Sequence, residues 1–272
     1  MALAFIAPGQ GAQFVGMGME LAKSYPQSRS VFEEVDDALG ENLSDLIWYG
    51  SIEDLTLTEN AQPALMATTL AVFRALQSEG LKLSDAKFVA GHSLGEYSAL
   101  AMAESLSISD AAKLLRIRGR AMQNAVPVGV GAMAAILGLP YSDLVEITKQ
   151  AASNGVCQAA NDNDPSQVVV SGHKGAVERA IEIAKEAGAK RAIPLPVSAP
   201  FHSELMAPAS LKMKDAISTI SIIEPTIPLV SNVRAQAVRL PAEIRSLLVE
   251  QVTGVVRWRE SIEWMANNGV TE

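Results

Sequence analysis

Ser93 is the residue in this sequence whose surroundings point most clearly to a reactive side chain, because it lies at the centre of a Gly-x-Ser-x-Gly turn. An apolar run precedes the turn and the amphipathic run 97–106 follows it, which predicts a strand, a sharp reversal and a helix. Gly91 and Gly95 have no Cβ atom, so the backbone can turn tightly and expose the Ser93 hydroxyl. The backbone N–H of Leu94 would then face an oxyanion formed on an attacked carbonyl group. This context favours a serine nucleophile for acyl chemistry over an ordinary tight turn.

A serine nucleophile needs a general base, and the sequence contains three histidines. His92 is adjacent to Ser93 but leaves the turn in another direction, which favours a packing role. His173 opens a predicted helix and reads as a capping or surface residue. His202 follows a proline-containing loop and is the best candidate for the base. The alternative for His202 is a structural histidine with satisfied hydrogen bonds.

The elements that must position these residues alternate between strands and helices. Strands are predicted at 3–7 and 88–91, and helices at 63–79, 97–106 and 109–125. Alternation of strands with helices of this length predicts a parallel sheet. The serine turn follows the second of these strands.

The pattern changes after a Pro/Gly-rich break near residue 127. The following segment has the order β-α-β-β-α-β, which is the ferredoxin-like split unit. Its strands are predicted at 132–138, 156–160, 167–171 and 191–197, its helices at 141–153 and 174–187, and a polar turn at 161–165. We therefore predict an α/β protein: an α/β-hydrolase-like large domain with a parallel sheet, formed by 1–126 and 198–272, and an inserted ferredoxin-like domain at 127–197.

Composition narrows the class of protein. Of the 272 residues, 49% are hydrophobic and 19% are charged, as in a globular protein with a large core. The net charge of −8 argues against nucleic acid as a partner. The single cysteine, Cys157, excludes an internal disulfide and lies in an apolar run, which predicts a buried thiol. The apolar N-terminus is short and lacks a basic region, and no apolar run reaches about 18 residues, so we expect a cytoplasmic protein without a membrane span.

No cofactor and no metal site are predicted. Gly9-Gln10-Gly11 follows the first strand like the start of a dinucleotide-binding fingerprint, but the third glycine and the ribose-binding acid are not evident.

Several further motifs occur in one order along the chain. They are Pro8-Gly9-Gln10-Gly11-Ala12-Gln13, the serine turn extended to Leu100, Arg118-Gly119-Arg120, Pro196-Val197-Ser198-Ala199-Pro200-Phe201-His202-Ser203, and Gln251 before Val256-Arg257-Trp258. With these motifs the chain resembles the malonyl-CoA:acyl carrier protein transacylases of bacterial type II fatty acid synthesis. The likeness spans the whole chain, including 131–135 and 161–172 in the insert.

The resemblance implies a mechanism. Ser93 would take the malonyl group as an ester, and His202 would act as general base and then as general acid. The backbone N–H groups of Gln10 and Leu94 would form the oxyanion hole. A backbone carbonyl near Gln251, rather than an aspartate, would orient the histidine.

The resemblance also implies the substrate site. Arg118 and Gln251 would line the acyl pocket, with the Arg118 guanidinium holding the malonyl carboxylate through two parallel hydrogen bonds. Phe201 would crowd the α-carbon of the acyl group, and His92 and Asn161 are counted among the substrate-binding residues. The substrates would be malonyl-CoA and the phosphopantetheine thiol of acyl carrier protein.

The residues alone do not separate Arg118 from its neighbours. Arg116, Arg118 and Arg120 all lie on one predicted helix, and each is consistent with a solvated helix face. Only the resemblance selects Arg118.

Two other functions use the same residues. The first is a serine esterase or thioesterase of the α/β-hydrolase type. The second is a module that binds carrier protein and whose serine is inert. We expect a monomer. In the resembling family a strand, a glycine-containing turn and a helix follow the position of Thr271-Glu272, and we expect their absence to affect stability and pocket closure rather than the chemistry.

Overall fold

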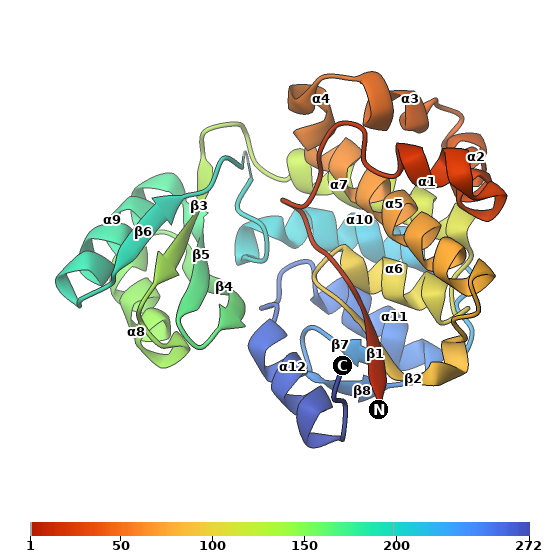
Figure 1. The fold of residues 1–272 in the computed structure, drawn as a ribbon. Helices are drawn as coiled ribbons and strands as arrows, with labels where there is room; N and C mark the ends of the chain where they lie inside the picture. The colour runs from red at the N-terminus through yellow and green to blue at the C-terminus, as the bar shows by residue number, and fades with distance from the viewer. Residues whose placement is uncertain (1, 198) are drawn as a thin grey trace.

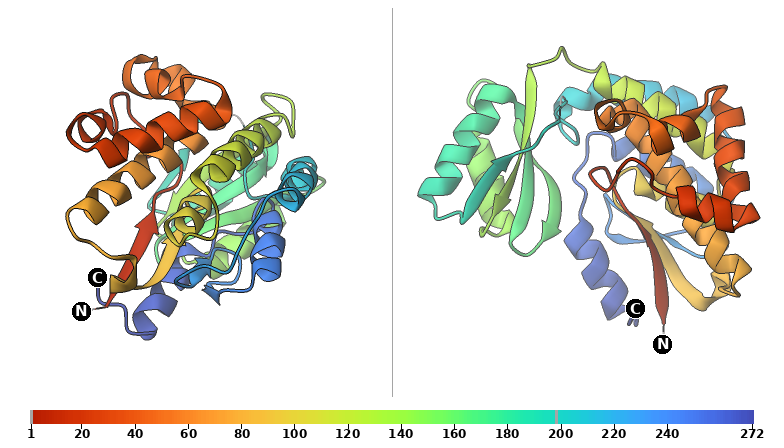
Figure 2. Two further views of the ribbon diagram at one scale, coloured as in Figure 1. Left: turned by 90° about the vertical axis from the view of Figure 1, so that its right-hand side faces the viewer. Right: turned by 45° about the horizontal axis from the view of Figure 1, so that its top comes forward.

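The computed structural model describes residues 2–197 and 199–272, and it places the chain in two parts, each built on a four-stranded sheet (Figure 1). The chain passes between the two parts before β3 and again after β6 (Figure 2). The predicted α/β class is confirmed. In the part of the chain that the structure describes, no helix is long and apolar enough to cross a membrane.

The sheet of the larger part has the strand order β1-β2-β7-β8. Its strands are β1 (Leu3–Ala7), β2 (Ala86–Gly91), β7 (Leu229–Ser231) and β8 (Gln236–Val238). The pairs β1–β2 and β2–β7 are parallel, as predicted. The edge strand β8 departs from the prediction, because it runs antiparallel to β7. A short turn joins β7 to β8, and its Ala235 has a left-handed φ of 52°, so the chain reverses at once instead of crossing over through a helix.

Helices cover both faces of this sheet. They are α1 (Met19–Ser24), α2 (Pro26–Leu39), α3 (Leu43–Tyr49), α4 (Ile52–Thr56), α5 (Thr58–Ser78), α6 (Gly95–Met102), α7 (Ile108–Gln123), α10 (Ala207–Ser218), α11 (Pro241–Glu250) and α12 (Trp258–Asn267), with 3₁₀ turns at Leu83–Asp85 and Glu204–Met206. Val89 of β2 packs into the main core of this part, whereas Ala90 packs with Met265 of α12. Successive residues of β2 thus point to opposite faces, as the period of a strand requires.

Helix α5 begins five residues earlier than predicted and contains Pro63 in its second turn. Proline has no N–H, so the carbonyl oxygen four residues earlier, that of Glu59, loses its helical partner. The Arg116 guanidinium of α7 donates to this oxygen at 2.8 Å and replaces the missing bond. The sequence pattern did not predict this helix start because the replacement donor lies 57 residues away.

The smaller part is the predicted ferredoxin-like unit. Its elements are β3 (Gly131–Leu137), α8 (Tyr141–Ala152), β4 (Cys157–Asp164), β5 (Gln167–His173), α9 (Lys174–Glu186) and β6 (Arg191–Pro194). The strand order is β4-β5-β3-β6, all antiparallel, and α8 and α9 enclose a separate core with it. Cys157 is buried in that core, as predicted, and burial raises the pKa of its thiol to about 11.

Strand β4 is longer than predicted, because it continues through the polar residues that were expected to form a turn. Asn161 pairs with Val256 of the larger part in a parallel bridge, which extends β4 beyond its own sheet. Asp162 is buried and accepts hydrogen bonds from Arg259 of α12, with a shortest distance of 2.8 Å. These contacts hold the smaller part next to the turn that carries Ser93. The domain limits of 126, 127 and 197 remain a prediction, and the limit at Ser198 lies outside the described residues.

Candidate active site

The turn that carries Ser93 joins β2 to α6, as predicted. A Cβ atom on Gly91 would lie 1.9 Å from the carbonyl oxygen of Gly95, and one on Gly95 would lie 2.6 Å from the carbonyl oxygen of Ala7. Both distances are impossible, so the two glycines are required for strand and helix to approach. Ser93 itself has a φ of 53°, a left-handed conformation that L-residues rarely adopt. Strain of this kind persists only where the surrounding structure fixes it, and it often marks a functional site.

The side chain of Asn232, in the turn after β7, holds this strained backbone. Its Oδ1 accepts a hydrogen bond from the Ser93 N–H at 2.7 Å, and its Nδ2 donates to the Gly91 carbonyl oxygen at 2.7 Å. Asn232 is completely buried. The amide therefore bridges the two sides of the serine turn.

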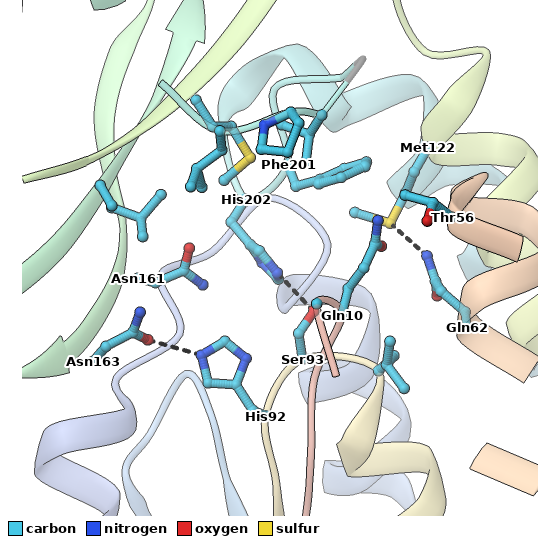
Figure 3. A pocket seen from close by; sticks show the side chains of 18 of the residues that line it. Gln10, Thr56, Gln62, His92, Ser93, Met122, Asn161, Asn163, Phe201 and His202 are labelled. Carbon is cyan, nitrogen blue, oxygen red and sulfur yellow. Dashed lines mark hydrogen bonds between the residues drawn. The ribbon is translucent and has the colours of Figure 1, made fainter. Parts of the chain in front are cut away.

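His202 is the histidine that reaches the serine. Its Nε2 lies 2.7 Å from Ser93 Oγ (Figure 3). Its Nδ1 lies 2.9 Å from the carbonyl oxygen of Gln251 and 3.1 Å from that of Gly254. Because a carbonyl oxygen only accepts, Nδ1 must carry the proton, and Nε2 presents its lone pair to the serine hydroxyl. The expected orientation by a main-chain carbonyl is present in the structure.

The surroundings of His202 keep its imidazole neutral. Burial, together with the nearby positive charge of Arg118, lowers the pKa of His202 to about 3. A neutral imidazole is the form that can take a proton from Ser93. The base is therefore in its reactive form across the whole neutral range of pH.

Arg118 lies on the other side of the serine hydroxyl. Its Nη2 donates to Ser93 Oγ at 3.0 Å and to Gln251 Oε1 at 2.9 Å, and its Nη1 donates to Gln62 Oε1 at 2.7 Å. The guanidinium carbon is 5.9 Å from the centre of the Tyr97 ring. Arg118 is 1% exposed, and burial lowers its pKa. The solvated helix face that the residues alone allowed is therefore wrong for Arg118.

Gln251 is placed differently from the expectation that it lines the pocket. It is fully buried behind Ser93 and Arg118 and is not among the residues that line the cavity. Its Nε2 donates to the Ser93 carbonyl oxygen at 2.9 Å. Gln251 thus contacts Ser93, His202 and Arg118 from beneath the cavity.

A cavity of about 300 Å³ opens above Ser93 between the two parts of the chain. From the larger part, Gln10, Arg118 and His202 line it, and from the smaller part Asn161 of β4 lines it. Phe201 stands over the cavity next to the base and is 9% exposed (Figure 3). The predicted site residues are thus brought together around one space, with Gln251 beneath it.

The backbone N–H groups of Gln10 and Leu94 lie in the cavity wall and make no hydrogen bond within residues 2–197 and 199–272. The Gln10 loop is fixed by a hydrogen bond from the Thr58 hydroxyl to Gln10 Oε1 at 2.8 Å. These two donors are available for an oxyanion.

The other histidines lie apart from the reacting atoms. His92 lines the cavity, but its Nε2 pairs with Asn163 Oδ1 at 2.8 Å, and its ring meets Trp258 edge to face. His173 begins α9 as predicted, but its side chain does not cap that helix. Its Nδ1 instead accepts a hydrogen bond from the Val156 N–H at 2.9 Å.

The solvated helix face predicted for Arg116 is also wrong, because Arg116 is buried and binds the Glu59 carbonyl and the Glu41 carboxylate. Arg120 is exposed as predicted, and it forms ion pairs with Glu41 and Glu59.

Sequence reasoning did not select Glu96, Asn232 or Gln62, although all three are buried and contact the site. For Glu96 a signal was present, since a lone carboxylate in the otherwise apolar helix after the serine turn is unusual in a buried element. Asn232 and Gln62 carry no such signal.

Known proteins are similar to this chain along nearly its whole length. Residues 4–268 match the family model described as acyl transferase domain. The malonyl CoA-acyl carrier protein transacylase of Bacillus subtilis is 48% identical over 99% of this chain and 84% of its own. The crystal structure of acyl-carrier-protein-S-malonyltransferase from Bartonella henselae is 56% identical, with a TM-score of 0.97 over 99% of this chain and 86% of that one.

A third relative was solved as a complex. It is a malonyl-transacylase bound to its type II PKS acyl-carrier protein, 41% identical to this chain, with a TM-score of 0.96 over 99% of this chain and 87% of that one. Motifs, site geometry, sequence identity and fold therefore agree, and the chain belongs to the malonyl-CoA:acyl carrier protein transacylase family.

Proposed function

We propose that this protein transfers the malonyl group of malonyl-CoA to the phosphopantetheine thiol of acyl carrier protein, and so supplies extender units for fatty acid synthesis. The observation that carries the proposal is the buried guanidinium of Arg118, one hydrogen bond from the Ser93 hydroxyl at the edge of the cavity. An acyl group that bears a free carboxylate matches a fixed cation in this position.

In the first half-reaction, Ser93 Oγ gives its proton to His202 Nε2 and attacks the thioester carbonyl. The N–H groups of Gln10 and Leu94 stabilise the oxyanion, and the Arg118 guanidinium holds the free carboxylate of the malonyl group. Collapse of the intermediate breaks the C–S bond, and the His202 imidazolium returns the proton to the departing CoA sulfur. The second half-reaction reverses these steps with the carrier thiol as nucleophile.

A serine thioesterase is the alternative that shares this chemistry. In the described residues His202 Nδ1 faces two main-chain carbonyls and no carboxylate, so the Ser-His-acid arrangement usual in α/β-hydrolases is not formed. Hydrolysis of malonyl-CoA, measured with and without the phosphopantetheinylated carrier protein, separates the two functions. Without carrier we expect only the single equivalent of CoA that leaves as Ser93 is acylated, and continued rapid CoA release only when the carrier is present as acceptor. Fast steady-state hydrolysis without carrier would favour the thioesterase.

A carrier-binding module with an inert serine is the non-enzymatic alternative. The 2.7 Å contact between Ser93 Oγ and His202 Nε2 argues for a reactive hydroxyl. A serine-directed phosphonate should label Ser93 rapidly, and no labelling would support the inert module.

We infer that the protein acts in the cytoplasm as a monomer. The monomer is supported by the site itself, since the nucleophile, base, arginine and oxyanion donors all come from one chain. Light scattering of the purified protein, with and without carrier protein, tests this state.

Replacing the base should slow acylation strongly. We expect His202→Ala to lower the rate of Ser93 acylation by about 10²–10⁴-fold, because general-base assistance is lost while the oxyanion hole remains. Rapid-quench measurement of the malonyl-enzyme checks this. His92→Ala is the matched control, since His92 lines the same cavity but pairs with Asn163. A loss below tenfold in His202→Ala with a larger loss in His92→Ala would reassign the base.

Phe201 should decide which acyl groups enter. Its ring stands over the cavity beside His202, where it would crowd a substituent on the α-carbon of the acyl group. We expect Phe201→Ser to admit methylmalonyl-CoA while retaining malonyl transfer, raising the ratio of methylmalonyl to malonyl acylation by roughly tenfold, the scale of one methyl group in an apolar pocket. Competition between the two donors gives this ratio, and an unchanged ratio would show that Phe201 does not limit the pocket.

A further inference from the structure

Beneath the active site lies a fully buried carboxylate that the mechanism above does not use. Glu96, in the first turn of α6, is 1% exposed. Its Oε1 accepts a hydrogen bond from the main-chain N–H of Asn232 at 3.2 Å, and its Oε2 accepts a short one from Gln251 Nε2. A buried carboxylate is costly, so it persists only where its hydrogen bonds are specific.

These contacts bear on the orientation of the Gln251 side chain. Its Nε2 is surrounded by three acceptors, the Glu96 carboxylate, the Ser93 carbonyl and Asn232 Oδ1, while its Oε1 accepts from Arg118 Nη2. A flipped amide would set its oxygen against three acceptors and its NH₂ against the guanidinium. Glu96 is the charged member of the three acceptors and provides the strongest of these hydrogen bonds.

Gln251 in turn connects the two functional side chains. Its Oε1 fixes the guanidinium of Arg118, and its main-chain oxygen accepts the Nδ1–H of His202. A shift of this one residue would therefore displace both the arginine and the base.

From this geometry we infer that Glu96 is a positioning residue for acyl transfer, which acts through Gln251 to hold Arg118 and His202 against Ser93. The inference rests on the proposed malonyl transfer and adds a residue to it. Glu96 accepts one hydrogen bond on each oxygen, which requires an ionised carboxylate, since protonation turns one oxygen into a donor and an amide offers only one acceptor oxygen.

Ionisation gives this role a pH dependence. Burial raises the pKa of Glu96 to about 7, although the hydrogen bonds from Gln251 and Asn232 and the charge of Arg118 oppose this. The groups that face it are Arg118 from α7, Tyr97 from α6, the hydroxyl of Ser231, Asn232 and Gln251. Burial raises the pKa of Tyr97 to about 12, so neither Tyr97 nor His202 titrates near neutral pH. Activity should thus rise with pH as Glu96 ionises around pH 7.

The test compares Glu96→Gln with wild type in malonyl transfer to phosphopantetheinylated carrier protein between pH 5.5 and 8.5, a range of roughly 1.5 pH units on each side of that pKa. We expect kcat/KM at the alkaline end to fall by roughly ten- to hundredfold, the scale of a small misplacement of catalytic groups. The rise near pH 7 should be present in wild type and absent in Glu96→Gln. Glu34→Gln is the matched control, because Glu34 also accepts hydrogen bonds, from Ser109, but lies on α2 away from the cavity. It should retain the wild-type profile.

A double-mutant cycle with Gln251→Ala distinguishes positioning from general support of the fold. If Glu96 acts through Gln251, Glu96→Gln should cost little further activity in the Gln251→Ala background, whereas independent effects would multiply. Multiplicative effects, or a wild-type profile that is flat through pH 7, would overturn the inference. If Glu96→Gln fails to fold, Gln251→Ala decides the question, because its profile should also lack the rise near pH 7, and a rise that persists there would overturn the inference. Lack of wild-type acylation by malonyl-CoA would instead contradict the proposed function.

Discussion

Ser93→Ala should carry no malonyl group after exposure to malonyl-CoA, and its transfer to carrier protein should fall by about 10⁴-fold or more, the scale seen when a serine nucleophile is removed from an enzyme. The reason is that, in the proposed mechanism, the ester forms on Ser93 Oγ, which contacts both His202 Nε2 and Arg118 Nη2. Neither the base nor the oxyanion donors can replace it.

The fold should survive this substitution. The left-handed backbone at Ser93 is held by main-chain hydrogen bonds with Asn232 and Gln251, which alanine keeps. The alanine Cβ occupies the place of the serine Cβ, so no new strain arises. Circular dichroism and the midpoint of thermal unfolding should match wild type. A malonyl adduct that forms on the alanine variant at the wild-type rate would show that another residue is the nucleophile.

Arg118→Ala should lose malonyl transfer while acetyl transfer is largely retained. The guanidinium is buried, and its Nε has no hydrogen-bond partner among the described residues, so donors remain for a substrate carboxylate. Removing one partner of a buried charged pair costs about 2–5 kcal/mol, which is roughly thirtyfold to several-thousandfold in binding. Acetyl-CoA has no carboxylate and does not depend on this pair.

The measurement is the rate of Ser93 acylation by malonyl-CoA divided by the rate with acetyl-CoA, determined for wild type and for each variant. Arg118→Ala also leaves the buried side-chain oxygens of Gln62 and Gln251 without their donor, which lowers the stability of the variant by about 1–3 kcal/mol for a buried group. Because this loss affects both acylation rates of the same variant equally, their ratio does not depend on it. Arg118→Lys is the useful comparison, since it keeps the positive charge but loses the planar guanidinium group that can donate two parallel hydrogen bonds. It should give an intermediate ratio. An equal fall in the rates of acetyl and malonyl acylation would mean that Arg118 stabilises the structure instead of binding the substrate carboxylate.

The parts of this site that the sequence predicted are those fixed by neighbours in the chain. The spacing of Gly91, Ser93 and Gly95 determines the serine turn, because the clash that a Cβ would cause there is local or involves the adjacent strand. The order of strands and helices likewise predicted the sheet of the smaller part and the first two strands of the larger sheet, but not β7 and β8. Helix α5 was predicted with the wrong start, because a side chain from another helix replaces the bond that Pro63 removes.

The parts that the residues alone did not predict depend on contacts between distant segments. Arg116 and Arg118 are two residues apart on one helix, yet the first supports α5 and the second faces Ser93, and nothing in their local sequence distinguishes them. Asn232 meets the serine turn across 139 residues, and Glu96 meets Gln251 across 155. The direction of β8 depends on a short turn whose left-handed residue is alanine instead of the expected glycine or asparagine.

The central claim is that Ser93 carries the malonyl group between CoA and the carrier thiol. Intact-protein mass spectrometry tests it most directly, after brief exposure to malonyl-CoA and again after addition of phosphopantetheinylated carrier protein. We predict a single malonyl adduct that maps to the peptide containing Ser93, persists in buffer, and moves to the carrier when it is added. An adduct on another residue, or one that is lost to water as fast as to the carrier, would contradict the account.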